Sequence, residues 1–278
     1  MPLRVAGKII RILSDVHFGD RASRVRRLRQ LAPLVEDADE IVFNGDTLDT
    51  RTGPNPAHTA ACLEEVRAFA RESWVPVTFL TGNHDPDISA HHSLDLANGE
   101  VFAVHGDMLF EDVVPWGRDA RELRTKIWHA LAARRDRDIS LADRLAIWRE
   151  AAGSIPQRHQ SEQHPLKYAL HFISDTVWPP TRFFEIFRAW HREPHLATEL
   201  IRRDRPNARF VLLGHTHRPA LRRVGDGPLA INTGSFTAPF GGRAVELADA
   251  RLRVVTIDYR GGEFRRGEVV AEFPLASG

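Results

Sequence analysis

Five short polar clusters, each directly after an apolar run, constrain this chain more than any other feature. In chain order the clusters are Asp15-x-His17, Gly45-Asp46-x-x-Asp49, Gly82-Asn83-His84-Asp85, His105-Gly106-Asp107 and Gly214-His215-Thr216-His217. The runs before them are short and apolar, as buried strands are: 9–13, 41–43, 75–80, 101–104 and 210–213. In α/β sheets, ligands bind beyond the carboxyl ends of strands. We therefore expect one site, assembled from loops at one sheet edge.

Helical patterns lie between these strands. Apolar residues recur at helical spacing within residues 22–35. Asn55 followed by Pro56 is typical of a helix start, with the asparagine as cap and the proline in the first turn. This second helix is expected to bury Val66 and Phe69. The alternation of strand and helix predicts an α/β fold.

Residues 111–205 show a different pattern. They hold five of the six tryptophans, and apolar residues spaced one helical turn apart predict four to five helices. We therefore divide the chain into a core of residues 1–110 and 206–278 and a helical insertion, or cap, of residues 111–205.

Phe183, Phe184, Phe187 and Trp190 form an aromatic stripe in this insertion, and two interpretations are open. The stripe faces a ligand or a membrane surface, or it packs the insertion onto the core, as such stripes usually do. The insertion starts just after His105 and ends just before the last polar cluster. Both ends are therefore expected at the polar site, and we expect the insertion to act as a lid that sets substrate choice.

The side chains of the five clusters indicate a metal site. Taken singly, each cluster is ordinary turn chemistry, but together they supply seven candidate ligands: the two aspartates Asp15 and Asp46, Asn83, and the four histidines His17, His105, His215 and His217. Without thiolates, such donors suit first-row divalent cations, with Mn expected first and Fe, Zn or Co as alternatives. Seven donors are too many for one tetrahedral ion and suit two ions that share a carboxylate. Two-metal sites suit phosphoryl chemistry, because charge accumulates on the equatorial oxygens.

In content and order, the five clusters resemble the signature of calcineurin-like metallophosphoesterases. The resemblance covers residues 8–106 and about 209–258. It implies a four-layer αββα sandwich, in which two mixed sheets are flanked by helices and two metals lie at the sheet edge. The ligands it implies are Asp15, His17 and His217 for the first metal, Asn83, His105 and His215 for the second, and Asp46 as the bridge.

The resemblance also implies the roles of residues around the metals. A hydroxide between the two ions would be the nucleophile that attacks phosphorus. His84 would face the substrate and donate a hydrogen bond or proton, and Asp85 would orient His84. For Asp49 two roles remain open: it holds a ligand imidazole, or it caps the following turn.

The layout around His105-Gly106-Asp107, with Leu109 and Asp112 before a helical insertion, looks like the UDP-2,3-diacylglucosamine hydrolase branch. Those enzymes cut the pyrophosphate of a lipid-linked nucleotide sugar, and their insertion grips acyl chains. This sequence departs from the main enzymes at His84, where they have arginine. A general phosphomonoesterase or phosphodiesterase, a nuclease and a non-catalytic scaffold are the alternatives. Scaffold relatives typically lose metal ligands, and every ligand position is filled here.

The composition of the chain limits the classes of molecule that it is expected to bind. The net charge of +1 gives no strong nucleic-acid signal, because nuclease grooves are usually basic. Cys62 is the only cysteine, so an intrachain disulfide is excluded. We see neither a signal peptide nor an apolar stretch of about 18 residues. The expected partner is a phosphorylated small molecule or a lipid-linked nucleotide, and the expected location is the cytoplasm, with peripheral membrane contact through the insertion.

Overall fold

The computed structural model describes residues 8–134, 139–174 and 178–276. Within these ranges the strands are β1 (Ile10–Leu13), β2 (Glu40–Asn44), β3 (Val77–Leu80), β4 (Ser93–Leu96), β5 (Val101–Val104), β6 (Phe210–Leu213), β7 (Ala220–Arg223), β8 (Leu229–Asn232), β9 (Arg243–Ala248), β10 (Arg251–Arg260) and β11 (Glu263–Pro274). The helices are α1 (Ala32–Val35), α2 (Pro56–Glu72), α3 (Ala120–Ala132), α4 (Leu141–Gly153), α5 (Pro165–Phe172) and α6 (Thr181–Asp204), with short 3-10 turns at η1 (Leu28–Leu31), η2 (Ala97–Gly99) and η3 (Asp107–Leu109).

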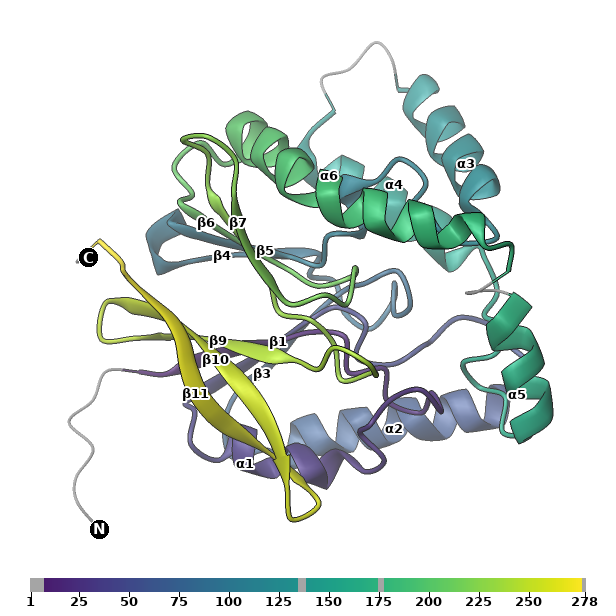
Figure 1. Cartoon of the computed structure of the whole chain (residues 1–278), viewed down its shortest axis with the longest axis horizontal. Coiled ribbons are helices and arrows are strands. Elements are labelled where there is room, and N and C mark those ends of the chain that lie inside the picture. The colour runs from purple at the N-terminus through teal and green to yellow at the C-terminus, as the bar shows by residue number, and fades with distance from the viewer. Residues whose placement is uncertain (1–7, 135–138, 175–177, 277–278) are drawn as a thin grey trace.

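Two mixed sheets lie face to face, and helices cover the outer side of each (Figure 1). The strand order is β11-β10-β9-β1-β2-β3 in the first sheet and β4-β5-β6-β8-β7 in the second. In the first sheet β1, β2 and β3 run parallel and β9 pairs antiparallel with β1. In the second, β5, β6 and β8 run parallel, while β4 and β7 are antiparallel edges. This is the four-layer αββα sandwich that the resemblance to calcineurin-like metallophosphoesterases implies.

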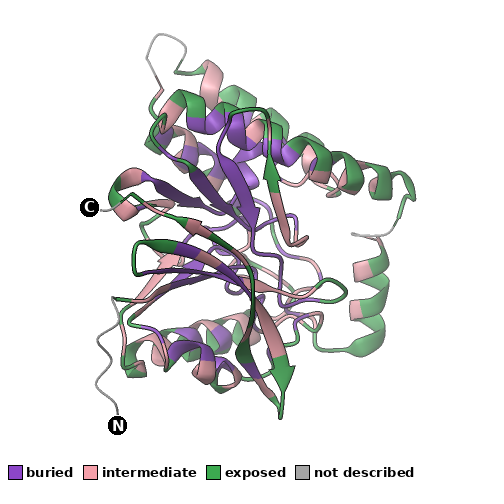
Figure 2. Ribbon diagram, turned by 60° about the vertical axis from the view of Figure 1, so that its left-hand side comes forward, coloured by how far each residue is buried: buried purple, intermediate pink, exposed green. Residues whose placement is uncertain are grey.

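Three apolar clusters hold the layers together, and alternation along the strands distributes side chains among them. In β1, Ile12 points between the sheets while Leu13 joins the cluster under α1 and α2. In β6, Leu212 points between the sheets and Val211 joins the cluster under α3, α4 and α6. The central strands of both sheets are therefore buried on two faces, which explains the continuous apolar runs in the sequence (Figure 2).

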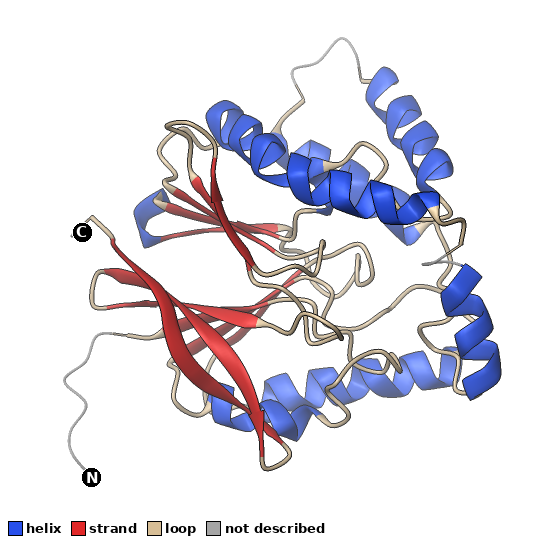
Figure 3. Cartoon of the chain, viewed as in Figure 1, coloured by secondary structure: helices blue, strands red, loops and turns tan. Residues whose placement is uncertain are grey.

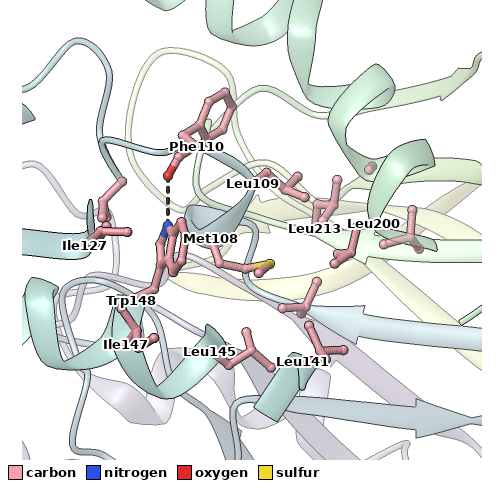
Figure 4. Packing of buried hydrophobic residues seen from close by; sticks show 14 of the residues in the cluster. Met108, Leu109, Phe110, Ile127, Leu141, Leu145, Ile147, Trp148, Leu200 and Leu213 are labelled. Atoms are coloured by element: carbon pink, nitrogen blue, oxygen red, sulfur yellow. Dashed lines mark hydrogen bonds between the residues drawn. The ribbon is translucent and has the colours of Figure 1, made fainter. Parts of the chain in front are cut away.

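Helices α3, α4 and α6 form the outer layer of the second sheet. Their buried residues share one cluster with residues of β5, β6 and η3. Trp148 of α4 lies in this cluster, and its Nε1–H donates to the carbonyl of Phe110 over 2.8 Å (Figure 4). The helices predicted within residues 111–205 are thus present, and three of them are packed as part of the sandwich.

The structure differs from the prediction in two places. Residues 22–35 are not one helix: a loop precedes η1 and α1, and Arg24 N–H donates to the Phe236 carbonyl over 2.9 Å. Val25 lies in this loop and is buried, so its position in the apolar pattern reflects burial and not a helix. The second difference lies in three strands that the sequence did not reveal: β7, β9 and β4, of which β4 is a short edge strand with polar residues. The helix start at Asn55 is confirmed, because its side chain accepts from His58 N–H over 3.1 Å.

Helix α5 and the first turns of α6 are much less buried than the other helices (Figure 2). Phe184 is 74% exposed and Phe187 is 61% exposed. We call the exposed side chains here the α5–α6 apolar surface: Leu166, Leu170, Ile173, Trp178, Phe183, Phe184 and Phe187. The interpretation that the aromatic stripe only packs onto the core is therefore wrong for its three phenylalanines. Within the described ranges, no helix combines enough length and apolar character to span a lipid bilayer.

Candidate metal centre

The five predicted clusters meet at one edge of the sandwich. They are the loops after β1, β2, β3, β5 and β6, and backbone hydrogen bonds join neighbouring loops. Asp15 N–H donates to Gly45 O over 3.1 Å, and Gly214 N–H donates to His105 O over 2.8 Å. In Figure 3 these loops gather at the strand ends on the side of the molecule where α5 lies.

One donor group consists of Asp15, His17, Asp46 and His217, each offering one ligand atom within 4.8 Å of the others. His217 Nε2 lies 3.2 Å from Asp15 Oδ1. It also lies 3.0 Å from His17 Nε2. Two imidazole nitrogens and a carboxylate oxygen therefore point at the same small volume.

The second donor group consists of Asp46, His105 and His215. His105 Nε2 lies 3.2 Å from Asp46 Oδ2. Asn83 adds an amide oxygen, because its Oδ1 lies 2.8 Å from His215 Nδ1. All seven residues predicted as ligands are thus brought together, and Asp46 belongs to both groups.

The histidines of the second group are held by the nitrogen that faces away from it. His105 Nδ1 lies 2.9 Å from Asn44 O, and His215 Nε2 lies 2.8 Å from Val113 O. Metal-binding histidines are usually oriented through their other ring nitrogen in this way. His105 Nε2 is buried and, although Asp46 Oδ2 lies 3.2 Å away, it makes no hydrogen bond of acceptable geometry within the described chain. A divalent cation would satisfy that atom, so the residues present fit a metal ion.

The backbone of the centre is strained. Asp15, His17, Asp46, His215 and His217 have φ between 49° and 66° and account for five of the ten non-glycine residues with positive φ in the described ranges. Such conformations cost roughly 1–3 kcal/mol each, persist only where the surroundings enforce them, and gather at functional sites.

Two glycines let the loops approach each other closely. A Cβ on Gly82 would lie 2.2 Å from Asp46 Oδ1, and one on Gly214 would lie 2.2 Å from Asp15 Oδ2. Real Cβ atoms do not approach so closely, so any side chain here would displace a carboxylate of the centre. The Gly in each of these two clusters is therefore required by space.

Burial and mutual charge set the protonation of the centre. Burial alone would raise the pKa of Asp46, but His105 and His84 outweigh it and hold that pKa well below its usual value. Burial lowers the pKa of His17 to about 4 and, together with His105, that of His215 to about 3. His17 and His215 are therefore neutral near pH 7, which metal coordination requires.

Asp85 does not orient His84, and the prediction of that contact is wrong. The Asp85 carboxylate accepts backbone N–H groups from Asp46 over 2.9 Å, Thr47 over 2.7 Å and Gly82 over 2.8 Å. It therefore ties the loops after β2 and β3 together. Burial and the neighbouring Asp46 charge raise its pKa to about 7.

Asp49 makes the contact that was predicted for Asp85. Its Oδ2 lies 2.7 Å from His84 Nδ1. The guanidinium of Arg51 binds Asp49 at two points, Nε to Oδ1 over 3.0 Å and Nη2 to Oδ2 over 2.6 Å. Burial would raise the pKa of Asp49, but Arg51 and His84 lower it to about 2. The imidazole that Asp49 holds is therefore that of His84 and not that of a predicted ligand. The other predicted role is confirmed, because Asp49 Oδ1 also accepts Arg51 N–H over 3.1 Å and so caps the following turn.

Sequence reasoning missed three residues beside the centre: Arg51, Trp190 as a polar contact, and Glu193. Arg51 stands two positions after Asp49, and a charged residue inside a polar cluster was a signal that could have been used. Trp190 and Glu193 come from α6, and nothing in their spacing relates them to residues 215–217.

A cavity of about 390 Å³ opens beside the centre. His17, Asn83, His84 and His217 line it, and so does Arg51. Its other lining residues include the cations Arg118 and Arg158 and the apolar side chains of Trp116, Leu123, Phe172, Ile186, Trp190 and Phe240. The cavity therefore offers metal donors, cations and apolar surface to one ligand.

Solved structures similar to this chain share little sequence with it. A dimetal phosphatase from Danio rerio is 13% identical with a TM-score of 0.46, over 97% of this chain and 99% of that one. Vacuolar Protein Sorting 29 from Cryptosporidium parvum is 12% identical with a TM-score of 0.42, over 97% and 99%. A conserved uncharacterized protein from Streptococcus pneumoniae, titled a predicted phosphoesterase, is 17% identical with a TM-score of 0.38, over 97% and 98%.

A search of curated proteins gives no match. A family model described as calcineurin-like phosphoesterase matches residues 9–219, which include every residue of the two donor groups. That match spans well over half of the chain. Together with two donor groups that share Asp46 at the edge of an αββα sandwich, it shows that the chain belongs to the calcineurin-like phosphoesterase family.

Proposed function

We propose that this protein hydrolyses a phosphorus–oxygen bond with the help of two divalent metal ions, Mn first among them. The observation that carries the proposal is the sharing of Asp46 between two donor groups. Asp15, His17 and His217 would hold one ion, and Asn83, His105 and His215 the other. Two such ions, when bound, activate water and neutralise charge on the phosphoryl oxygens.

His84 supplies the hydrogen bond or proton that the departing oxygen needs. Its Nδ1 is engaged with Asp49, so Nε2 is the nitrogen left for a substrate in the cavity. Asp49 orients the ring, and Arg51 keeps Asp49 ionised. Proton donors placed in this way contribute about 10²–10⁴-fold to rate.

For the substrate, we propose an amphiphilic phosphate compound, of the kind represented by UDP-2,3-diacylglucosamine. The cavity supports this, because Arg118 suits a further anionic group while Phe172, Trp190 and Phe240 suit an apolar chain. A nucleic acid suits the chain less well, because single strands need strongly basic grooves and the net charge is only +1.

The α5–α6 apolar surface supports a peripheral contact with a membrane that carries anionic lipid. Four basic residues, Lys167, Arg182, Arg188 and Arg192, lie on α5 and the first half of α6, against the single acidic side chain of Glu185 outside the buried core. Exposed aromatic residues beside cations are typical of helices that lie in a membrane interface. This contact would bring the cavity beside a lipid-linked substrate.

A substrate screen tests the proposal. The Mn-loaded protein is assayed on an acylated nucleotide diphosphate sugar, its deacylated form, bis-(4-nitrophenyl) phosphate, 4-nitrophenyl phosphate and single-stranded DNA. We expect hydrolysis of the acylated compound at least about tenfold faster than of the deacylated one, since burying an acyl chain gains about 0.8 kcal/mol per methylene. Equal rates on both sugars contradict an amphiphilic substrate, and faster cleavage of DNA favours a nuclease.

A further inference from the structure

Glu193 is a buried carboxylate in the middle of α6 that plays no part in the proposed hydrolysis. It is 6% exposed. Its Oε1 accepts two hydrogen bonds, from Thr216 Oγ1 over 2.8 Å and from Asn232 Nδ2 over 2.9 Å. Burying a carboxylate costs free energy that an apolar residue at the same position would avoid. The two hydrogen bonds to Glu193 offset part of this cost.

Thr216 stands between His215 and His217, one from each donor group. A second residue of α6 holds its backbone: Trp190 Nε1–H donates to the Thr216 carbonyl over 2.9 Å. Two residues of α6 thus bind Thr216: Glu193 accepts from its hydroxyl group, and Trp190 donates to its carbonyl.

Asn232 extends this hydrogen-bond network to Gly214, at the start of the loop after β6. Its Nδ2 donates to Gly214 O over 2.6 Å as well as to Glu193. Nδ2 also lies 3.0 Å from Thr216 Oγ1. Glu193 therefore connects α6, the end of β8 and both sides of His215 in one buried network.

The two histidines need such support because both have positive φ, 66° for His215 and 58° for His217. A residue with a Cβ atom keeps a positive φ only where its surroundings enforce that backbone conformation. We infer that Glu193 is a positioning residue for the metal centre: through Thr216 it holds His215 and His217 so that each faces its own donor group. This inference rests on the proposed function, because it takes both donor groups to bind metal.

Metal titration of variants tests the inference. Glu193→Ala removes both hydrogen bonds, Glu193→Gln keeps an oxygen that accepts them, and Glu199→Gln changes an exposed acid on the same helix as a control. Mn²⁺ affinity is measured on metal-free protein by calorimetry, and the visible absorption spectrum is recorded with Co²⁺. Loss of such an orienting contact typically weakens metal binding by about 10–100-fold.

We expect Glu193→Ala to lose about that much affinity at both ions and to shift the Co²⁺ spectrum. Glu193→Gln and Glu199→Gln should stay within about threefold of the unmodified chain, well inside the 10–100-fold range. A Glu193→Ala protein that melts at a lower temperature but binds both ions with unchanged affinity and spectrum overturns the inference and leaves the proposed function standing.

Thr216→Val provides a second route where Glu193→Ala does not fold, because it removes the hydroxyl group and keeps the volume. It should lower the affinity for both ions in the same way, and unchanged affinity again overturns the inference. A folded unmodified protein that binds no Mn²⁺, Co²⁺ or Zn²⁺ overturns the proposed function, and the inference falls with it.

Discussion

Asp49 Oδ2 lies 2.7 Å from His84 Nδ1, and the Arg51 guanidinium binds the same carboxylate at two points. Three residues from two loops therefore act as one unit beside the metal donors. The carboxylate of Asp85, next to His84 in the chain, is turned to three backbone N–H groups instead. Substitutions of Asp49 and Asp85 should therefore have different effects, the first on turnover and the second on stability.

His84→Ala should lower turnover by about 10²–10⁴-fold while metal content stays unchanged. Asp49→Asn should lower turnover less, about 10–100-fold, because it leaves the imidazole in place but unoriented. Both losses should be smaller for a nitrophenolate leaving group, which needs little protonation. Steady-state kinetics with good and poor leaving groups, beside metal analysis, measure this. The exposed Asp226→Asn serves as control, and an equal loss for both leaving groups contradicts proton donation by His84.

Asp85→Asn should instead lower stability, because the carboxylate accepts three backbone hydrogen bonds inside the protein. An amide at this position places an N–H₂ group against one of those donors, and a buried unsatisfied donor costs roughly 1–3 kcal/mol. Thermal unfolding of the metal-free proteins is the measurement. A variant as stable as the unmodified chain, with a turnover defect like that of His84→Ala, would restore a catalytic role for Asp85.

Asp46→Ala should weaken the binding of both metal ions, whereas Asp15→Ala should weaken mainly one. The reason is that only Asp46 belongs to both donor groups. Protein purified without chelators should contain about two ions per chain, the number that such a site holds. Elemental analysis gives the content, and Mn²⁺ titration of each variant gives the affinities. Two unchanged affinities in Asp46→Ala would show that this carboxylate does not bridge.

The combined change Phe183→Ser, Phe184→Ser and Phe187→Ser should reduce binding to vesicles that contain phosphatidylglycerol by at least about tenfold. Burying one phenylalanine side chain gains roughly 1.5–3 kcal/mol, so the loss of three is readily measured by co-sedimentation. The matched control is Val269→Ser with Val270→Ser, two exposed apolar residues on β11. Equal binding of the unmodified and triply changed proteins rules out this surface as the membrane contact.

Glu193 should make the metal-free protein less stable as the pH rises toward 7. Burial raises its pKa to about 7; the hydroxyl of Thr216 and the amide of Asn232 lower it, Asp15 raises it and Arg218 lowers it. Its ordinary pKa is 4.5, so the folded state holds more protons than the unfolded state between these values, and stability falls as pH rises through them. At about 1.4 kcal/mol per pKa unit, the loss is roughly 3 kcal/mol.

Urea unfolding between pH 4.5 and 8 measures this loss, and comparison with Glu193→Gln isolates it. Asp85 and Asp107 also have raised pKa values, but they titrate in both proteins and their effect cancels in the difference. A stability difference between the two proteins that is the same at every pH would contradict a raised pKa at Glu193.

The strands that end at the five polar clusters, and the seven candidate ligands, were predictable because each depends on local sequence. An apolar run followed by Asp, Asn or His fixes both a buried strand and a polar loop at its end, as β1 with Asp15 shows. The parallel arrangement of β1, β2 and β3 then places the loops at one edge. Resemblance to the family added the pairing of donors, which local pattern does not contain.

Contacts between distant side chains were not predictable in this way. Spacing alone could not decide whether Asp49 or Asp85 meets His84, because both lie in loops and the choice depends on how the loops fold back. The hydrogen bond between Thr216 and Glu193 joins layers of the sandwich that only the complete fold brings together. The exposure of Phe184 also follows from helix orientation, which an aromatic stripe leaves open.

Each donor group draws on both sheets and on both ends of the chain: Asp15 follows the first strand, and His217 lies beyond the sixth. During synthesis the ribosome therefore releases the early aspartates long before their partner histidines exist. A nascent chain cannot hold the ions with full affinity until the segment containing residue 217 has emerged and docked. Metal binding at full affinity therefore follows the synthesis of β6, and it links the strands made first to a strand made much later.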